Sequence, residues 1–424
     1  MEKRPETGFY PADILLPAKD SDLERFAVIA CDQFTSQPEY WEKLEGFVGD
    51  AKSALRLILP EYRLSQSEKA VPEIHAAMEE YVSSGALSPR VQSGFVITKR
   101  TTKSGTRTGI IGKIDLEKYE YRKGAKPLIR ATEGTIEERI PPRMAVRRGA
   151  KIESPHILIL IDDAGRTVIE PAAEKAQAGE KLYDFELNMG GGHIAGWALT
   201  DAAELERIQG ALLALINEGD ENPLLFAVGD GNHSLATAKA CWEEAKKELS
   251  ESERLTDKRR YALAEIENIH DDALIFEPIH RIVKGIGAYD MLDKLHDYAQ
   301  KAGFTISMSG KASNTSQKIT IIGENGDVTL YLTGSGLAPL AVGTIQAFLD
   351  DLTNENDKLT VDYIHGEDAL RRMAGETATG ILLPAMGKSE LFPAVIKGGS
   401  LPRKTFSMGE STEKRYYLEC RALR

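Results

Sequence analysis

The segment 229–234, Gly-Asp-Gly-Asn-His-Ser, holds the residues of this chain whose types and spacing are best suited to chemistry. Asp230 and His233 are separated by two residues, and the apolar run 224–228 before them predicts a buried strand. A helix is predicted from about Ser234, because five apolar residues recur at helical spacing: Leu235, Ala238, Cys241, Trp242 and Ala245. Such a junction directs the N–H groups of the helix start toward one point, where anions bind. This turn is therefore the expected position of an active site.

Phosphoryl transfer is the chemistry that these groups would suit. It needs N–H donors around the phosphate oxygens, a group that accepts a hydroxyl proton, and usually a metal ion anchored by a carboxylate. Asp230 would anchor the metal or orient a hydroxyl, and His233 would contact the transferred group. The other residues of the turn would surround the phosphate: Gly229, Gly231, Asn232 and Ser234. The alternative is a plain turn, in which Asp230 caps the helix and His233 lies at the surface.

Five arginines within nineteen positions form a local basic group in an acidic chain: Arg130, Arg139, Arg143, Arg147 and Arg148. Guanidinium groups bind pairs of phosphate or carboxylate oxygens. Arg130, Arg139 and Arg143 are therefore candidate phosphate ligands. The alternative is a solvated face on which the arginines pair with Glu137 and Glu138.

The segment 396–406 is a further candidate, since two glycines follow Lys397 and a lysine follows Arg403. Glycine lets the backbone approach a ligand closely, so this segment would close over a bound anion with Lys397 and Arg403 as ligands. The alternative is a plain β-hairpin connection. Cys31 is interpreted as a buried thiol at a strand end, and His156 as a structural histidine.

The chain has 424 residues, enough for two or three domains, and its 42% hydrophobic content suffices for packed cores. No apolar run reaches the roughly 18 to 20 residues that cross a bilayer, the first residues lack an apolar signal segment, and the three cysteines are scattered. These features indicate a cytoplasmic protein without a membrane partner. The net charge of −12 argues against nucleic acid and leaves a small anionic substrate or nucleotide as the partner. The residues do not decide the oligomeric state, for which a homodimer is one option.

Helix and strand patterns mixed along the whole chain predict an α+β protein with mixed sheets and flanking helices. The sequence is divided into an N-terminal α/β region (1–120), a core with the anion-binding turn (121–300) and a C-terminal α+β region with a basic tail (301–424). Helices are predicted over 38–48, about 72–82, 201–217 and 344–352. Strands are predicted over 26–31, 94–100, 107–115, 156–161, 318–322 and 328–332.

Four segments resemble the uncharacterised bacterial family DUF1015: 27–41, 229–234, 363–366 and 391–406. The resemblance extends over nearly the whole chain. Because the family is uncharacterised, it implies no activity.

A second resemblance, to the core of the ParB/sulfiredoxin superfamily, rests on 216–219, the following strand and the turn 230–233. It implies a ParB/sulfiredoxin-like centre of the fold and a turn that binds nucleotide phosphates. The free serine kinases of that superfamily carry an Asp-Gly-His-His-Arg version and phosphorylate a small hydroxylated metabolite. Asp230 and His233 match this motif, whereas Asn232 stands at its first histidine and Ser234 at its arginine. Another cation, one of the arginines in 130–148 or Lys397, would have to replace that arginine.

The same resemblance implies a glutamate base after a short upstream strand, and Glu133 is its positional analogue. The implied function is a nucleotide-dependent phosphotransferase for a small hydroxylated metabolite, with Asp230, His233 and Glu133 as catalytic residues. Mg²⁺ held by Asp230, and ATP or ADP, would be the cofactors. Two alternatives stay open: a non-catalytic sensor of a nucleotide or phosphorylated metabolite, and a phosphatase or other hydrolase that uses the same anion site.

Overall fold

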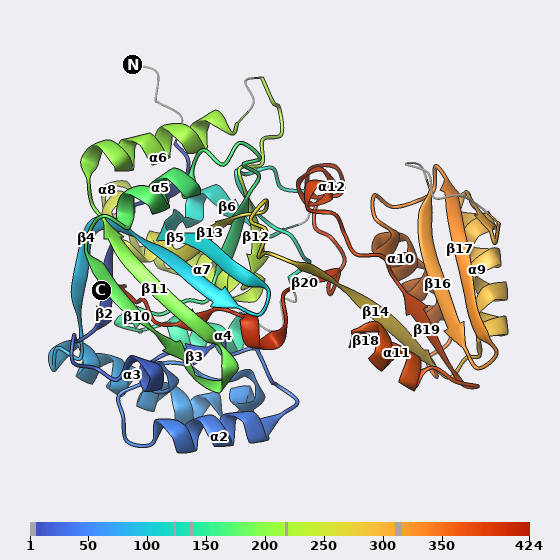
Figure 1. Cartoon of the computed structure of the whole chain (residues 1–424), viewed down its shortest axis with the longest axis horizontal. Coiled ribbons are helices and arrows are strands. Elements are labelled where there is room, and N and C mark those ends of the chain that lie inside the picture. Colours follow the sequence, from blue (N-terminus) through green and yellow to red (C-terminus); the bar gives the residue numbers. More distant parts are fainter. Residues whose placement is uncertain (1–5, 123, 136–139, 217–218, 310–315) are drawn as a thin grey trace. The chain divides into compact units, whose positions relative to one another are not determined.

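Long strands build a mixed β-sheet with helices on both of its faces (Figure 1). In β4 (Leu87–Thr102), Phe95 and Ile97 belong to one hydrophobic core and Val96 to another, as the two-residue repeat of a strand requires. The strand order is β10-β11-β4-β5-β13-β9-β12-β7-β6, with β1 beside β5 and β2 beside β4. This computed structural model describes residues 6–122, 124–135, 140–216, 219–309 and 316–424.

The other strands of this sheet are β1 (Phe9–Tyr10), β2 (Ala12–Pro17), β5 (Gly105–Asp115), β6 (Tyr119–Glu120), β7 (Ile129–Ala131), β9 (Leu158–Ile161), β10 (Lys181–Leu187), β11 (Gly192–Leu199), β12 (Phe226–Asp230) and β13 (Tyr261–Asn268). Two short pairs lie outside it: β3 (Val28–Ile29) with β21 (Tyr416–Tyr417), and β8 (Ile152–Glu153) with β22 (Arg421–Ala422). The helices of the same part of the chain are α1 (Leu23–Phe26), α2 (Pro38–Val48), α3 (Ser67–Ser83), α4 (Ile140–Arg147), α5 (Ile169–Ala176), α6 (Ala202–Ala214), α7 (Asn232–Ala245) and α8 (Glu251–Thr256).

Helices cover both faces of the large sheet. Helices α5, α6 and α7 bury apolar residues such as Ala172, Ile208 and Trp242 in the core on one face. Helices α2 and α3 bury residues such as Leu44 and Ile74 in the core on the other face. The result is a layered arrangement in which strand edges, rather than strand faces, remain open for a functional site.

A second, smaller sheet has the order β15-β17-β16-β19-β14-β18, with β20 beside β14. Helices α9 and α10 contribute residues to one hydrophobic core of this sheet, and Leu370 of α11 belongs to another. Its strands are β14 (Phe276–Lys284), β15 (Phe304–Ser307), β16 (Gln317–Gly323), β17 (Gly326–Gly334), β18 (Thr360–His365), β19 (Ala378–Leu382) and β20 (Phe406–Met408). Its helices are α9 (Ala288–Ala302), α10 (Ala341–Glu355), α11 (Glu367–Met373) and α12 (Leu391–Gly398). Among the helices in the described ranges, none combines the length and apolarity of a membrane span.

Contacts group the chain into unit 1, residues 1–275 with 409–424, and unit 2, residues 276–408. The boundaries of these two units differ from the boundaries at residues 120 and 300 that were expected from the sequence. Strand β5 pairs with β13 across the first boundary, and residue 300 falls inside α9. The segment 409–424 returns to unit 1, a long-range contact that no local pattern indicates.

The α+β class with mixed sheets is confirmed, and several predicted elements are found at their expected places. Helix α2 covers 38–48 as predicted, with Pro38 at its first position, where the missing N–H costs nothing. The strand predicted over 26–31 is wrong in part, because α1 ends at Phe26 and β3 keeps only two residues. The hairpin alternative for the tail is also wrong, because residues 391–398 form α12.

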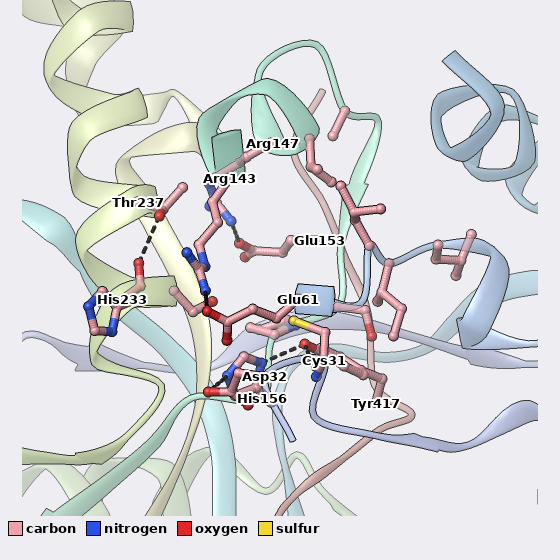
Figure 2. Close-up of a pocket in the computed structure, with 18 of the residues that line it drawn as sticks. Cys31, Asp32, Glu61, Arg143, Arg147, Glu153, His156, His233, Thr237 and Tyr417 are labelled. Carbon is pink, nitrogen blue, oxygen red and sulfur yellow. Dashed lines mark hydrogen bonds and ion pairs between the residues drawn. The ribbon is translucent and has the colours of Figure 1, made fainter. Parts of the chain in front are cut away.

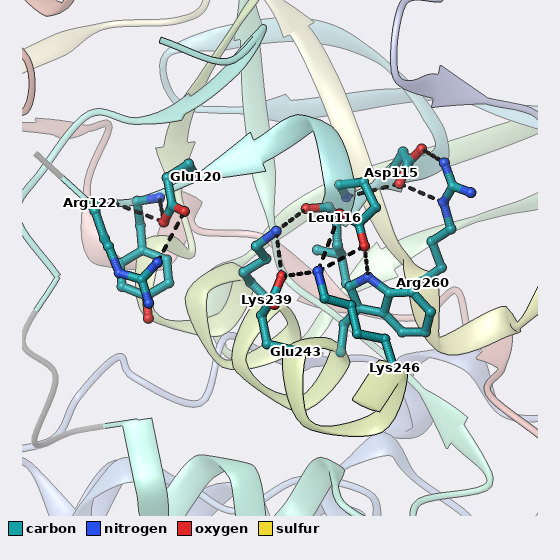
Figure 3. A network of polar contacts seen from close by, with 11 residues as sticks. Asp115, Leu116, Glu120, Arg122, Lys239, Glu243, Lys246 and Arg260 are labelled. Carbon is teal, nitrogen blue, oxygen red and sulfur yellow. Dashed lines mark hydrogen bonds and ion pairs between the residues drawn. The ribbon is translucent and has the colours of Figure 1, made fainter. Parts of the chain in front are cut away.

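Side chains of α7 bind the helix to the connection between β5 and β6 (Figure 3). Lys239 Nζ donates to the carbonyl of Leu116 at 2.8 Å, and the indole N–H of Trp242 donates to Glu117 at 2.6 Å. Lys246 Nζ lies 3.1 Å from the same carboxylate. These bonds position the helix whose first turn carries His233.

Buried ion pairs bind the returning C-terminal segment to the sheet. Arg415 lies 2.6 Å from Glu265 of β13 and 2.7 Å from Glu419. Arg100 of β4 donates to the carbonyl of Lys414 at 2.6 Å. Residues 412–419 are therefore held against β3, β4 and β13 by charged groups and not by apolar packing alone.

Glu267 of β13 gives unit 1 an expected pH dependence. The residue is 0% exposed, and burial raises the pKa of its carboxyl group. The guanidinium of Arg107, 3.0 Å away, lowers this pKa, whereas the charges of Glu265 and Asp271 raise it further. The resulting pKa is about 8. Between its ordinary value of 4.5 and about 8, the folded protein keeps a proton that the unfolded chain releases. The free energy of unfolding should therefore fall as the pH rises through this window, by about 1.4 kcal/mol per unit.

Urea unfolding of the wild type and of Glu267→Gln at pH 5, 6, 7 and 8 measures this effect. Tryptophan fluorescence is the readout, because all three tryptophans, Trp41, Trp197 and Trp242, lie in unit 1. The variant should lose most of the slope. Equal slopes in the two proteins would show that Glu267 is ionised in the folded state.

Candidate functional site

The turn 229–234 and Glu133 lie at the same edge of the large sheet, where the strands β12 and β7 end. Strands β7 and β12 run parallel, and Ala131 pairs with Val228. Glu133 follows Ala131 by two residues, and Asp230 follows Val228 by two residues. The two carboxylates therefore lie at the same end of the paired strands. The hydroxyl of Thr132 donates to the carbonyl of Val228 at 2.6 Å and holds the two chain segments together at this point.

Gly231 makes the sharp connection between β12 and α7. Its φ is +77°, in the left-handed region, and a Cβ at this position would lie 3.0 Å from the Cα of Ile157. Helix α7 begins at Asn232, two residues before the predicted start, and its first intrahelical bond runs from Leu235 N–H to Gly231 O at 2.9 Å. Asp230 accepts the N–H of Gly231 at 2.9 Å and therefore does not act as the helix cap that the alternative required.

Gly231→Ala should destabilise unit 1 by more than its matched control, Gly85→Ala. Both glycines have nearly equal φ values, +77° and +76°, so each alanine carries the left-handed backbone cost of about 1–2 kcal/mol. At Gly85 no described atom lies within 4 Å of the added Cβ, whereas at Gly231 the backbone of Ile157, just before β9, must move. We expect an additional loss of at least about 1 kcal/mol for Gly231→Ala in urea unfolding. Equal losses would contradict the close packing of the turn on Ile157.

The first turn of α7 lines a cavity of about 140 Å³ (Figure 2). His233, Ser234 and Thr237 reach it from α7, Arg143 and Arg147 from α4, and Asp32 from the loop after β3. Glu61, Glu153, Ser154, His156 and Tyr417 complete its polar lining, and Cys31, Met78, Pro155 and apolar residues of 57–64 and 146–152 form the rest. The described lining does not include Gly229, Asp230, Gly231, Asn232 or Glu133. The predicted turn therefore contributes its helix side to the cavity.

Asp32, His156 and Tyr417 form a polar group in this cavity. Tyr417 Oη lies 2.6 Å from His156 Nδ1, and His156 Nε2 faces Asp32 Oδ2 at 3.8 Å. Burial, Cys31 and Asp32 raise the pKa of Tyr417 well above its ordinary value, so its hydroxyl keeps its proton.

Asp32 is ionised in this environment. Burial opposes its charge, but His156, Gln33 and Lys414 outweigh that effect and hold the pKa of Asp32 below its ordinary value. Its side chain is 31% exposed, so a ligand in the cavity can reach it. An ionised, accessible carboxylate beside a helix N-terminus can accept a proton from a hydroxyl group.

Lys414 joins this group to the predicted turn. Its Nζ lies 3.3 Å from Asp230 Oδ2, and its charge also acts on Asp32. The lysine is thus near two carboxylates that come from segments about 200 residues apart in the sequence. No motif of the sequence indicates Lys414.

The arginines of the basic group are engaged with protein atoms. Arg130 is buried and donates to the carbonyls of Pro127 and Pro223 and to both oxygens of Asn222. Each of the others pairs with a glutamate: Arg143 with Glu61 at 3.0 Å, Arg147 with Glu153 at 2.5 Å and Arg148 with Glu244 at 2.9 Å. Arg139, Glu137 and Glu138 lie outside the described residues. Of the three predicted arginine ligands, only Arg143 is seen at the cavity.

Lys397 and Arg403 belong to unit 2 and are described within that unit. Lys397 is in α12, and the guanidinium of Arg403 lies over the ring of Tyr363, 5.8 Å from its centroid. Buried Arg281 donates to the carbonyl of Lys404 at 3.0 Å, next to Arg403 in the chain. Their predicted role as phosphate ligands stays a prediction.

Sequence reasoning missed the contributions of Asp32, His156 and Lys414. Asp32 follows a predicted strand and lies within the segment that resembles DUF1015, a signal that would have justified its inclusion. His156 precedes β9, which is antiparallel to β12, so only the strand pairing shows that it reaches the same edge. Cys31, interpreted as a buried thiol at a strand end, is half-buried and lines the cavity, and burial raises the pKa of its thiol to about 12.

The residues at Asp230 do not form a ready metal site. In the part of the chain that the structure describes, no group of three His, Cys, Asp or Glu side chains gathers as metal ligands do. The two oxygens of Asp230 face the N–H of Gly231 and the ammonium of Lys414. A donor set of one carboxylate opposite an ammonium group does not fit Mg²⁺, which prefers several oxygen ligands.

Three solved structures show what the chain is similar to in shape. SbnI with a C-terminal truncation, from Staphylococcus aureus, is 11% identical with a TM-score of 0.37, covering 70% of this chain and 82% of its own. A free serine kinase in complex with AMP is 13% identical with a TM-score of 0.37, covering 72% and 90%. A conserved hypothetical protein from Pyrococcus furiosus is 13% identical with a TM-score of 0.34, also covering 72% and 90%. Scores this low leave fold and function to be argued from the chain itself.

The sequence comparisons give a family. Curated proteins provide no significant match to this chain. Residues 12–352, more than half of the chain, match the family described as "Protein of unknown function (DUF1015)". The chain belongs to the DUF1015 family.

Proposed function

We propose that unit 1 binds a nucleotide and transfers a phosphoryl group from it to the hydroxyl of a small metabolite. The observation that carries this proposal is one cavity shared by two groups. The first turn of α7 presents His233 and Ser234, and the segments after β3 and before β9 present the ionised Asp32 and His156. An anion site and a proton acceptor within one small cavity are the two parts that phosphoryl transfer requires of a protein.

The phosphate would bind at the start of α7. The backbone N–H groups that precede the bond from Leu235 to Gly231 point out of the helix, and the helix dipole adds partial positive charge there. The hydroxyl of Thr237 donates to the carbonyl of His233 at 2.7 Å and holds this turn. His233 would contact the transferred group from the same turn.

Asp32 would accept the proton. The hydroxyl oxygen of the metabolite forms a bond to the terminal phosphorus of the nucleotide, and the bond from that phosphorus to the bridging oxygen breaks. The hydroxyl proton passes to the Asp32 carboxylate, and the bridging oxygen leaves with the shortened nucleotide. His156 Nε2 would orient Asp32, since the ring is itself held by Tyr417. Glu133, at the same sheet edge, is the second candidate for the proton acceptor.

Two finer statements belong to the same proposal. The resemblance of 216–219 and 230–233 supports a ParB/sulfiredoxin-like core made of β7, β12 and α7. Mg²⁺ would supply charge neutralisation on the phosphates of a bound nucleotide, and we derive no step through a metal held by Asp230. ATP or ADP is the donor to test first, and the reaction would take place in the cytoplasm.

The test is to incubate the purified full chain with ATP or ADP, Mg²⁺ and serine or another hydroxylated metabolite. Conversion of the nucleotide and appearance of a phosphorylated metabolite would support the proposal. A nucleotide-induced rise in melting temperature without turnover would favour the sensor, and release of inorganic phosphate alone would favour a hydrolase. If the protein neither binds nor converts the nucleotide, the proposed function is overturned.

A further inference from the structure

A phosphate at this site requires a cation. The arginines of the basic group are poorly suited to this role, because they already bind other groups of the protein. Arg130 is occupied by backbone carbonyls and by Asn222, and Arg143 pairs with Glu61 at 3.0 Å. Releasing either arginine would leave half-buried partner groups without their hydrogen bonds, which is costly. Ser234 stands where the resembling kinases have an arginine. The charge must therefore come from another residue.

Lys414 has the position that this role demands. Its Nζ is 3.3 Å from Asp230 Oδ2, at the turn that precedes α7, and its charge lowers the pKa of Asp32 in the cavity. The lysine therefore stands near both ends of the proposed reaction, the phosphate turn and the proton acceptor. Its side chain is 12% exposed, so the ammonium group is shielded enough to interact strongly. Lys414 is not among the described residues that line the cavity, so it would meet a phosphate at the turn beside Asp230.

The backbone holds Lys414 firmly in place. Its carbonyl accepts from Arg100 Nη1 at 2.6 Å, and the neighbouring carbonyl of Arg415 accepts from the N–H of Ala30 at 2.9 Å. In the antiparallel pairing of β21 with β3, Tyr416 lies opposite Ile29, so Lys414 stands at the end of this pair from which the chain continues to Asp32. A cation on such a support is pre-organised, so that little of its electrostatic effect is lost to rearrangement.

We propose that Lys414 is the cation that contacts the phosphate at this site, an inference that rests on the proposed function. An ammonium group has three N–H donors, so Lys414 can keep Asp230 with one and bind phosphate oxygens with another. Asp230 then acts as a positioning residue that orients Lys414, in place of the metal-anchoring role expected from the sequence. The ligand class is a phosphate ester or anhydride, of which a nucleotide and inorganic phosphate are the simplest members.

The test compares Lys414→Gln, Lys414→Arg and Asp230→Asn, with Lys151→Gln as the control for a surface ion pair. Isothermal titration with ADP, and competition by inorganic phosphate, give the dissociation constants. Lys414→Gln should weaken ADP and phosphate at least tenfold, and Lys414→Arg should restore part of the loss. Asp230→Asn should retain phosphate binding, because the ammonium group remains. Lys151→Gln should bind like the wild type.

The outcomes separate this inference from the proposed function. Wild-type turnover with ADP affinity unchanged in Lys414→Gln would overturn the role of Lys414 and leave the phosphotransferase standing. Phosphate binding that needs Lys414, in a protein without turnover, would support the role and overturn the phosphotransferase. A wild type that binds neither ADP nor phosphate would overturn both. If Lys414→Gln does not fold, the double variant Lys414→Met with Asp230→Asn removes both charges, and its affinity is compared with that of Asp230→Asn.

Discussion

Arg415→Met should lower the free energy of unfolding of unit 1 by about 3–5 kcal/mol, the usual effect of removing one partner from a buried ion pair. Arg415 is 7% exposed, and its guanidinium lies 2.6 Å from Glu265 and 2.7 Å from Glu419. It also donates to the carbonyl of Pro155 at 3.0 Å. Methionine fills much of the same space but leaves two buried carboxylates without their cation.

Urea unfolding followed by tryptophan fluorescence measures this loss in unit 1 alone, because all three tryptophans lie there. Arg148→Met is the matched control, since the pair of Arg148 and Glu244 is exposed and should contribute less than about 1 kcal/mol. Neutralising Glu265 and Glu419 to glutamine in the Arg415→Met background should restore part of the stability. A loss below 1 kcal/mol for Arg415→Met would show that the C-terminal segment does not depend on these charges.

The fold could be predicted from the sequence where local signals decide it. Pro38 at the first position of α2 and the alternating residues of β4 and β5 are of this kind, and their elements are found as expected. Strand β3 is different, because its two residues are extended through pairing with β21, nearly 390 positions away. A short segment stabilised by so distant a partner carries no periodic signal of its own. Helix α12 had such a signal in Leu391, Phe392 and Val395, and the nearby glycines obscured it.

The site was only half predictable for the same reason. The turn 229–234 was found because strand, glycine and helix signals follow one another directly. Asp32, His156 and Lys414 come from three separate segments, and only the pairing of β3 with β21 and of β9 with β12 places them near the turn. The arginines illustrate the opposite error. Their clustering in sequence indicated an anion site, whereas the structure pairs Arg143, Arg147 and Arg148 with glutamates.

Asp32→Asn should lower the turnover of the proposed phosphotransferase by about 10²- to 10⁴-fold, the usual contribution of a proton acceptor. The amide keeps the size of the side chain and removes only its ability to take a proton. Nucleotide affinity should stay equal or increase, because a negative charge near Lys414 and the phosphate is lost. This split between turnover and binding is not expected from a variant that merely disturbs the fold.

Glu133→Gln is the matched comparison, since Glu133 reaches the same sheet edge without lining the cavity. It should lose less than tenfold in turnover, and the reverse pattern would assign the proton acceptor to Glu133. The wild-type pH profile adds a second criterion. Because the pKa of Asp32 is held below its ordinary value, the acid limb that Asp32 produces should lie below about pH 4. Full turnover in both variants would exclude both carboxylates as the proton acceptor and would overturn the role proposed for Asp32.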